Sequence, residues 1–124
     1  MPHSLFLGKQ GYLKKKGNAV KKDWKKRYVV LDDIRLSYYE SYEQYYEGNP
    51  LKVIDTLTAS VKVDDAMPNR FEFITVHKTF VFQTESIAET EEWVRAIKNS
   101  IELRINNNGQ VMNYLIAEER RVEE

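Results

Sequence analysis

The chain has 124 residues, no cysteine, and 19 basic against 19 acidic residues. This length suits one domain. The lack of cysteine excludes disulfides and thiolate chemistry. No stretch of the sequence approaches the roughly 20 apolar residues that a helix needs to cross a bilayer. Residues 1–8 show no signal-peptide pattern, so we expect a cytoplasmic protein, either complete or a module of a larger one.

The first two thirds of the chain predict short strands separated by turns. Aromatic and β-branched stretches alternate there with Gly, Asn, Asp and Pro, the residues that favour turns. The predicted strands are 10–16, 24–31, 35–40, 52–57, 60–63, 70–75 and 79–83. The tyrosine- and glutamate-rich run from Tyr38 to Glu47 is predicted to be an acidic surface loop with stacked aromatic rings. A protein-contact or phosphorylation patch is the alternative for this run.

After residue 85 the apolar residues recur with the period of a helix. Ser86 followed by Glu89 forms a capping-box signature at its start. We therefore predict an amphipathic helix over 86–103, with Trp93 on its buried face. The run Asn106–Gly109 should end this helix, and residues 110–124 are expected to form a tail or a second, weaker helix.

The strongest functional signal is a basic stretch near the N-terminus. Between Lys9 and Arg27 there are nine basic residues and one acid, Asp23, in a chain whose formal net charge is zero. The rest of the chain must therefore be acidic to the same extent. Such a dipolar molecule presents one face that attracts anions.

Strand alternation gathers several of these cations at one end of one sheet face. Along each of the first three predicted strands, apolar core residues share a face with polar residues nearer one end. The expected core residues are Leu13, Val29, Leu31 and Leu36, and the expected rim residues are Lys15, Lys25, Arg27 and Tyr38. Such cations can bind several phosphates, because guanidinium groups grip two oxygens and ammonium groups act as point charges. A shift of one residue would instead turn Lys14 or Lys16 inward.

Taken in order, these segments resemble the pleckstrin homology (PH) domain family. The matching segments are 11–17, 24–31, 36–39 and, in the helix, Trp93. The resemblance implies a mainly β fold with one C-terminal α-helix: a seven-stranded bent antiparallel sheet, or partly open barrel, capped by the helix. It places the domain at 9–105, after an N-terminal extension (1–8) and before a tail or linker (106–124).

The resemblance also implies a phosphoinositide site. The motif of the family is a lysine on the first strand, a gap, and then a basic residue, any residue and Arg, which Lys15, Lys25 and Arg27 match. Tyr38 matches a tyrosine that contacts phosphate in members preferring 3-phosphorylated lipids, and Lys52 falls near a further basic position. The implied ligand is phosphatidylinositol 3,4,5-trisphosphate, followed by the 3,4-bisphosphate.

Four further lysines, Lys14, Lys16, Lys21 and Lys22, are expected to add auxiliary contacts to an anionic membrane, each worth about 1 kcal/mol. The resulting hypothesis is a module that recruits its protein to the inner leaflet of the plasma membrane. The alternative is a protein-interaction module of the same fold, whose partner, such as a small GTPase, binds the helix, the tyrosine run or the tail.

Other functions are disfavoured by the residues present. Zero net charge and few aromatic residues near the basic stretch argue against nucleic-acid binding. His3 and His77 are the only histidines and no cysteine accompanies them, which argues against a metal site. The sequence contains no catalytic triad pattern and no Walker loop, so we expect neither an enzyme nor a cofactor.

Overall fold

The computed structural model describes residues 8–17 and 23–123, with side chains described for 8–17 and 23–106. Its elements are β1 (Lys9–Lys16), β2 (Trp24–Leu31), β3 (Arg35–Tyr39), α1 (Tyr42–Glu47), β4 (Lys52–Asp55), β5 (Ser60–Val63), β6 (Arg70–Ile74), β7 (Thr79–Gln83) and α2 (Ile87–Glu123). All seven predicted strands are confirmed, and their ends differ from the prediction by at most two residues.

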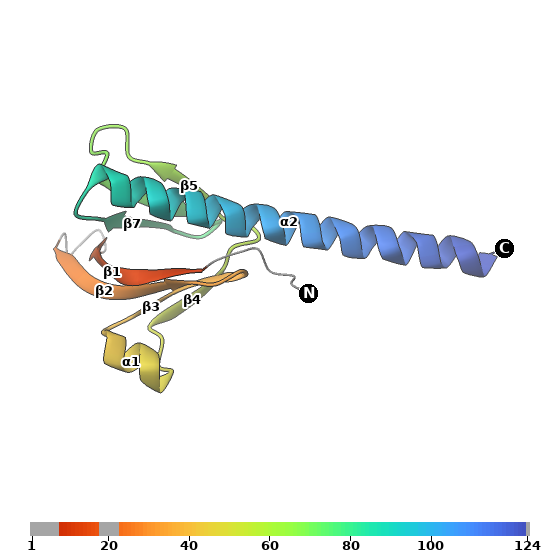
Figure 1. Ribbon diagram of the computed structural model, residues 1–124, viewed down its shortest axis with the longest axis horizontal. Coiled ribbons are helices and arrows are strands. Elements are labelled where there is room, and N and C mark those ends of the chain that lie inside the picture. The colour runs from red at the N-terminus through yellow and green to blue at the C-terminus, as the bar shows by residue number, and fades with distance from the viewer. Residues whose placement is uncertain (1–7, 18–22, 124) are drawn as a thin grey trace.

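The strands form one antiparallel sheet in the order β4-β3-β2-β1-β7-β6-β5. Within the described residues, no pairing joins β4 to β5, so the sheet bends but does not close into a barrel. Helix α2 runs along the β5–β7 side of the sheet, while α1 lies beside β3 and β4 (Figure 1). The predicted mainly β fold, a bent seven-stranded antiparallel sheet with one C-terminal helix, is therefore confirmed.

The core lies between the inner face of the sheet and the first turns of α2. All four residues that alternation assigned to the core are buried: Leu13, Val29, Leu31 and Leu36. Trp93 of α2 is also buried, as predicted, and stacks on Phe71 of β6 with ring centroids 6.5 Å apart. Each such side chain contributes about 1.5–3 kcal/mol by leaving water, so α2 is an integral part of the fold.

Helix α2 begins as the sequence predicts. The Ser86 hydroxyl accepts a hydrogen bond from the Glu89 N–H at 3.1 Å, which satisfies one free donor of the first turn. The Glu89 carboxylate accepts from the N–H of Glu85 at 3.3 Å, one residue earlier than a capping box requires. The start of the helix therefore has a serine cap supported by a nearby carboxylate.

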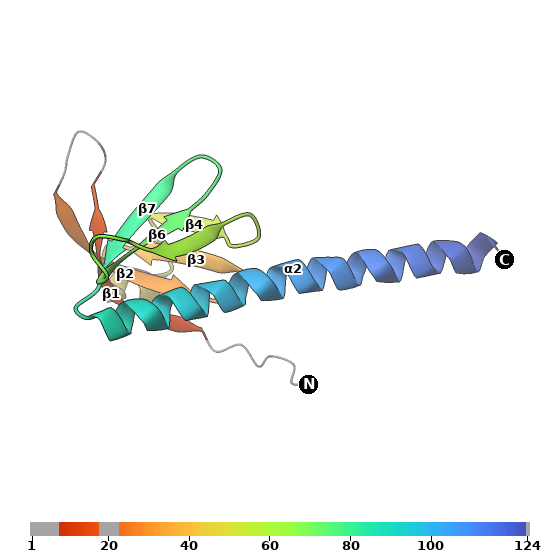
Figure 2. The ribbon, with the colours of Figure 1, turned by 90° about the horizontal axis from the view of Figure 1, so that it is seen from above.

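The predicted end of α2 is wrong. The helix continues through Asn106–Gly109 and ends at Glu123, projecting well beyond the sheet (Figures 1 and 2). Asn and Gly each lower helix stability by only about 0.5–1 kcal/mol relative to Ala. Residues 115–121 are mostly Leu, Ala, Glu and Arg, which are good helix formers. Because strong helix formers lie on both sides, the helix continues through Asn106–Gly109.

The loop prediction for the tyrosine run is also wrong, because the run contains α1. Ser41 caps this helix by accepting from the Gln44 N–H at 3.2 Å. Gly48 ends it in the left-handed conformation, with φ of 78°, which glycine adopts without strain. The predicted stacking of aromatic rings is present: Tyr45 lies 5.4 Å from Tyr28 and 5.2 Å from Tyr39 between ring centroids.

Candidate functional site

Strand register places the five predicted headgroup residues on one face of the sheet. Lys15 lies opposite Lys25, and Arg27 lies opposite the buried Leu13. Tyr38 lies opposite the buried Val29 on β2 and opposite Lys52 on β4. Because directly opposed residues point to the same side of a sheet, all five share the concave face that carries the core.

Lys15 is the innermost of these cations. Its Nζ lies 5.2 Å from the centroid of the Tyr38 ring and 5.8 Å from that of Phe80, distances at which an aromatic face attracts a cation. Lys14 and Lys16 are exposed on the opposite face. The register therefore turns Lys15 inward, and the alternative shift by one residue does not occur.

The electrostatic environment of Lys15 is unfavourable to its own charge. Partial burial is the main cause that lowers the pKa of Lys15, followed by the nearby charges of Lys78 and Arg27. Like charges in a partly desolvated site repel each other, so each one favours loss of the proton from its neighbour. An anion bound among these groups would offset the repulsion.

Tyr38 lies deeper than the rim position that the sequence predicted. Its side chain is only 8% exposed and belongs to the core cluster. The ring makes edge contacts with Phe80 and Phe82 at centroid distances of 6.2 and 6.4 Å. Burial raises the pKa of the Tyr38 phenol, which Arg27 partly opposes. The hydroxyl therefore stays protonated at neutral pH and able to donate a hydrogen bond.

Lys25 and Lys52 are more accessible, whereas Arg27 is half-buried like Lys15. The Lys25 Nζ forms an ion pair with Asp23 at 3.3 Å, with both side chains about half exposed. Arg27 donates from Nη1 to the Lys26 carbonyl at 3.1 Å. Lys52 is exposed on β4. Exposed pairs of this kind are worth about 0–1 kcal/mol, so Lys25 and Arg27 can exchange these partners for a stronger anion.

One cation of the site was missed by sequence reasoning. Lys78, in the turn between β6 and β7, places its Nζ 5.0 Å from the centroid of Phe80, the same ring that Lys15 approaches. The turn is distant in sequence, but β1 pairs with β7 at Lys15 and Phe82. Only this long-range pairing reveals the proximity. We call Lys15, Lys25, Arg27 and Lys78, with Tyr38 beneath them, the cationic cluster.

The described ends of the connection between β1 and β2, Gly17 and Asp23, lie beside this cluster, and Asp23 pairs with Lys25. A 2.7 Å hydrogen bond from the Gly17 N–H to the Asp23 carbonyl closes the base of this loop. Trp24, the first residue of β2, also lies at the base of the loop, with the Arg70 guanidinium 4.8 Å from its ring centroid. The predicted auxiliary residues Lys21 and Lys22 lie outside the described residues.

The described residues contain neither a metal-binding group nor a membrane-spanning helix. Among the residues that the structure describes, no three His, Cys, Asp or Glu side chains are grouped so that they could hold a metal ion. Over the same residues, no helix combines the length and apolarity needed to span a bilayer.

Comparison with known proteins identifies the family. The model of the PH domain family matches residues 7–102. Pleckstrin homology domain-containing family A member 2 of Mus musculus is 36% identical over 101 residues, which cover 77% of this chain but 24% of that protein. Arf-GAP with Rho-GAP domain, ANK repeat and PH domain-containing protein 2 of Homo sapiens is 29% identical over 81% of this chain and 6% of its own length. The chain thus spans a quarter or less of these two relatives.

Solved structures agree with this assignment. The C-terminal PH domain of pleckstrin in complex with D-myo-Ins(1,2,3,4,5)P5 is 32% identical, with a TM-score of 0.60 over 74% of this chain and 95% of that one. The PH domain of human oxysterol binding protein-related protein 11 has a TM-score of 0.73 over 82% and 85% of the two chains, at 18% identity, and so shows the fold alone. The chain belongs to the PH domain family, whose members are lipid- or protein-interaction modules.

Proposed function

We propose that this PH domain recruits its parent protein to the inner leaflet of the plasma membrane by binding phosphoinositide headgroups at the cationic cluster. The observation that carries the proposal is the convergence of three cations from three parts of the chain. Lys15 from β1 lies against Tyr38 and Phe80 and feels the charges of both Arg27 from β2 and Lys78 from the β6–β7 turn, which also lies against Phe80. A headgroup with several phosphates supplies the charge that this arrangement lacks.

Each residue has a distinct role in the proposal. Arg27 offers a planar fork that grips two phosphate oxygens, and Lys15 and Lys78 act as point charges. The Tyr38 hydroxyl, protonated at neutral pH, donates one further hydrogen bond. Lys25 and Lys52 flank the site on β2 and β4.

We further propose that the site prefers 3-phosphorylated inositol lipids. The match of Lys15, Lys25 and Arg27 to the family motif, together with Tyr38, favours 3-phosphorylated lipids, with the 3,4,5-trisphosphate ahead of the 3,4-bisphosphate. The inositol pentakisphosphate complex of the pleckstrin domain supports the general chemistry, since that relative binds a multiply phosphorylated inositol. It does not by itself favour one lipid over another.

The test is cosedimentation with liposomes at physiological salt. The panel contains the 3,4,5-trisphosphate, the 3,4-bisphosphate, the 4,5-bisphosphate and phosphatidylserine alone. Arg27→Ala should weaken binding to the preferred lipid about tenfold to a hundredfold, since it removes a charge-assisted bidentate contact.

Arg35→Ala is the matched control. Arg35 is an exposed arginine at the start of β3, beside the turn that follows Leu31, and it pairs with Asp32. This variant should bind like the wild type. Equal binding of the wild type and Arg27→Ala to all anionic liposomes would reject the headgroup site and leave only nonspecific surface charge.

A further inference from the structure

Strand β5 forms an open edge of the sheet. It is the last strand in the sheet order and pairs only with β6, with Val61 opposite Phe73 and Val63 opposite Phe71. The N–H of Asp64 donates to the carbonyl of Arg70 at 3.0 Å. Antiparallel pairs alternate between hydrogen-bonded and non-hydrogen-bonded. Val61 and Val63 are therefore in non-hydrogen-bonded pairs, with their N–H and C=O groups directed away from β6.

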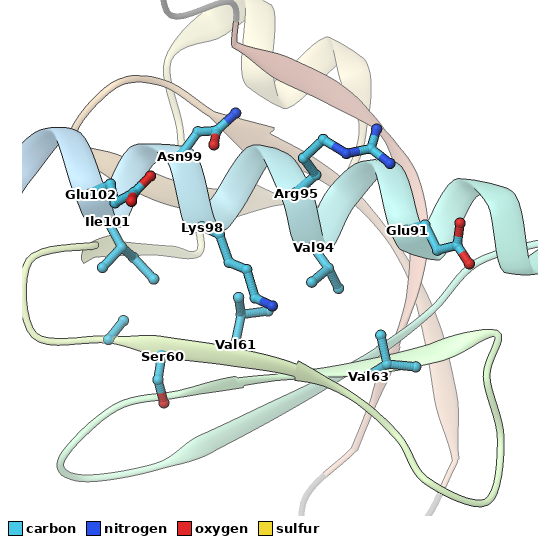
Figure 3. A pocket seen from close by; sticks show the side chains of 11 residues that line it. Ser60, Val61, Val63, Glu91, Val94, Arg95, Lys98, Asn99, Ile101 and Glu102 are labelled. Atoms are coloured by element: carbon cyan, nitrogen blue, oxygen red, sulfur yellow. The ribbon is translucent and has the colours of Figure 1, made fainter.

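An apolar groove runs between this strand and α2. It is an open surface groove with a volume of about 710 Å³, which is within the range of sites that hold a ligand. Val61 and Val63 rise from β5 toward the helix, and Val94 and Ile101 descend from α2 toward the strand (Figure 3). The side chains of Val61 and Val63 thus line the groove, while their backbone groups reach the open edge.

Charged side chains of α2 line the helical side of the groove. These residues are Glu91, Arg95, Lys98 and Glu102. Lys98 points from α2 toward Val61, across the middle of the groove (Figure 3). No described residue forms an ion pair with Lys98, so its charge is available to a partner that carries a carboxylate.

From this arrangement we propose that the groove binds an extended peptide segment of a partner protein as an additional strand on β5. The peptide backbone pairs with Val61 and Val63, as in other cases of strand addition to a sheet edge. Alternate side chains of the added strand point to the face covered by α2, where they are apolar and fill the groove. One acidic side chain of the peptide pairs with Lys98.

The same features limit which segments can bind. β5 has four residues, and the exposed Lys62 lies on its opposite face; short edge strands and lysines discourage indiscriminate strand pairing. Backbone pairing supplies affinity that does not depend on sequence, while the groove and Lys98 select for alternating apolar residues with one carboxylate. This surface lies on a different part of the molecule from the cationic cluster, so one domain can bind a lipid and a peptide together.

The experiment starts from a random linear ten-residue peptide library displayed on phage and selected on the whole chain. Enriched peptides are then synthesised with a fluorescent label and measured by anisotropy. We expect enriched sequences with apolar residues at alternate positions and a Glu or Asp between them. In ¹⁵N spectra, the amides of Val61 and Val63 should shift more than that of Lys62.

Variants locate the binding surface. Lys98→Glu should weaken the enriched peptide about tenfold, and a peptide whose acid is replaced by Lys should recover affinity for this variant. Lys62→Glu, the matched control on the other face of β5, should bind normally. Arg27→Ala should also bind the peptide normally, so failure of the lipid proposal would leave this result unaffected.

Two outcomes would overturn the proposal. One is the absence of any enriched sequence. The other is an enriched peptide whose binding is indifferent to Lys98→Glu and leaves the Val61 and Val63 amides unshifted, since such a peptide binds elsewhere. The fluorescence spectrum of the buried Trp93, expected to match the wild type in Lys98→Glu, shows that this variant is folded independently of lipid binding.

Discussion

The ammonium group of Lys15 is held close to two other cations by residues distant in sequence. Since Lys78 is one of the causes that lower the pKa of Lys15, Lys78→Ala should raise that pKa toward the ordinary value of 10.5. The sign follows because removing a neighbouring positive charge favours the protonated form of the remaining amine. An NMR titration of the lysine side chains measures the change directly.

Lys98→Ala is the control for this titration, because Lys98 lies on α2 and is not among the causes that shift Lys15. The same Lys78→Ala variant should bind soluble inositol phosphates more weakly, since it removes a point charge from the cluster. An unchanged Lys15 pKa in Lys78→Ala would show that the β6–β7 turn does not hold Lys78 near Lys15 in solution.

Single positions differ in how far the sequence determines them. Alternation along the first strand, anchored by the apolar Leu13, favoured Lys15 as the inward lysine, but only the strand register excluded its two neighbours. The depth of Tyr38 could not be predicted, because it depends on Phe80 and Phe82 arriving from β7. Lys78 was missed for the same reason: local pattern carries no information on which distant turn lies beside a strand.

A buried polar contact joins helix α2 to the half of the sheet formed by β2, β3 and β4. The Ser100 hydroxyl lies 2.9 Å from that of Thr56, after β4, and donates to the carbonyl of Asp33 at 3.2 Å. Both Ser100 and Thr56 are fully buried. Ser100→Ala should therefore lower the free energy of unfolding by about 1–3 kcal/mol, because it leaves buried polar groups with fewer partners.

Urea denaturation followed by tryptophan fluorescence measures this loss, since Trp93 lies buried on the same helix. Asn99→Ala is the matched control: its side chain is exposed one position earlier, and because Ala favours the helix more than Asn does, this variant should lose no stability. Equal loss in both variants would show that the contact with Thr56 is not the cause, since Ala favours the helix at both positions.

Elements were predicted well where periodicity was strong and poorly where local signals were brief or conflicted. The seven strands and the start of α2 followed from alternation and from Ser86. The six-residue α1 escaped detection because its tyrosines also suit strands and loops, although Ser41, Gln44 and Gly48 carried its cap signals. The Asn-rich segment 106–109 was predicted to end α2, but the helix continues through it. Helix propensity is only a weak guide to where a helix ends.

At the scale of the whole molecule, the basic N-terminal third and the acidic remainder form a dipole that should orient the domain at an anionic surface. Long-range attraction acts on the rate of association, while contacts in the site act on the rate of dissociation. Lys14 is exposed on the outer face of β1, and Arg27 belongs to the cationic cluster. Lys14→Ala should therefore slow association, and Arg27→Ala should mainly speed dissociation.

Surface plasmon resonance on vesicles containing the preferred phosphoinositide separates the two rates. Raising the salt above 0.15 M, where the Debye length is already about 8 Å, should slow association of the wild type and shrink its difference from Lys14→Ala. The effect of Arg27→Ala on dissociation should persist, because a headgroup bound in a partly buried site is screened less. If salt erased the effects of both variants alike, the cationic cluster would act only through surface charge, and the contacts assigned to Arg27 would be wrong.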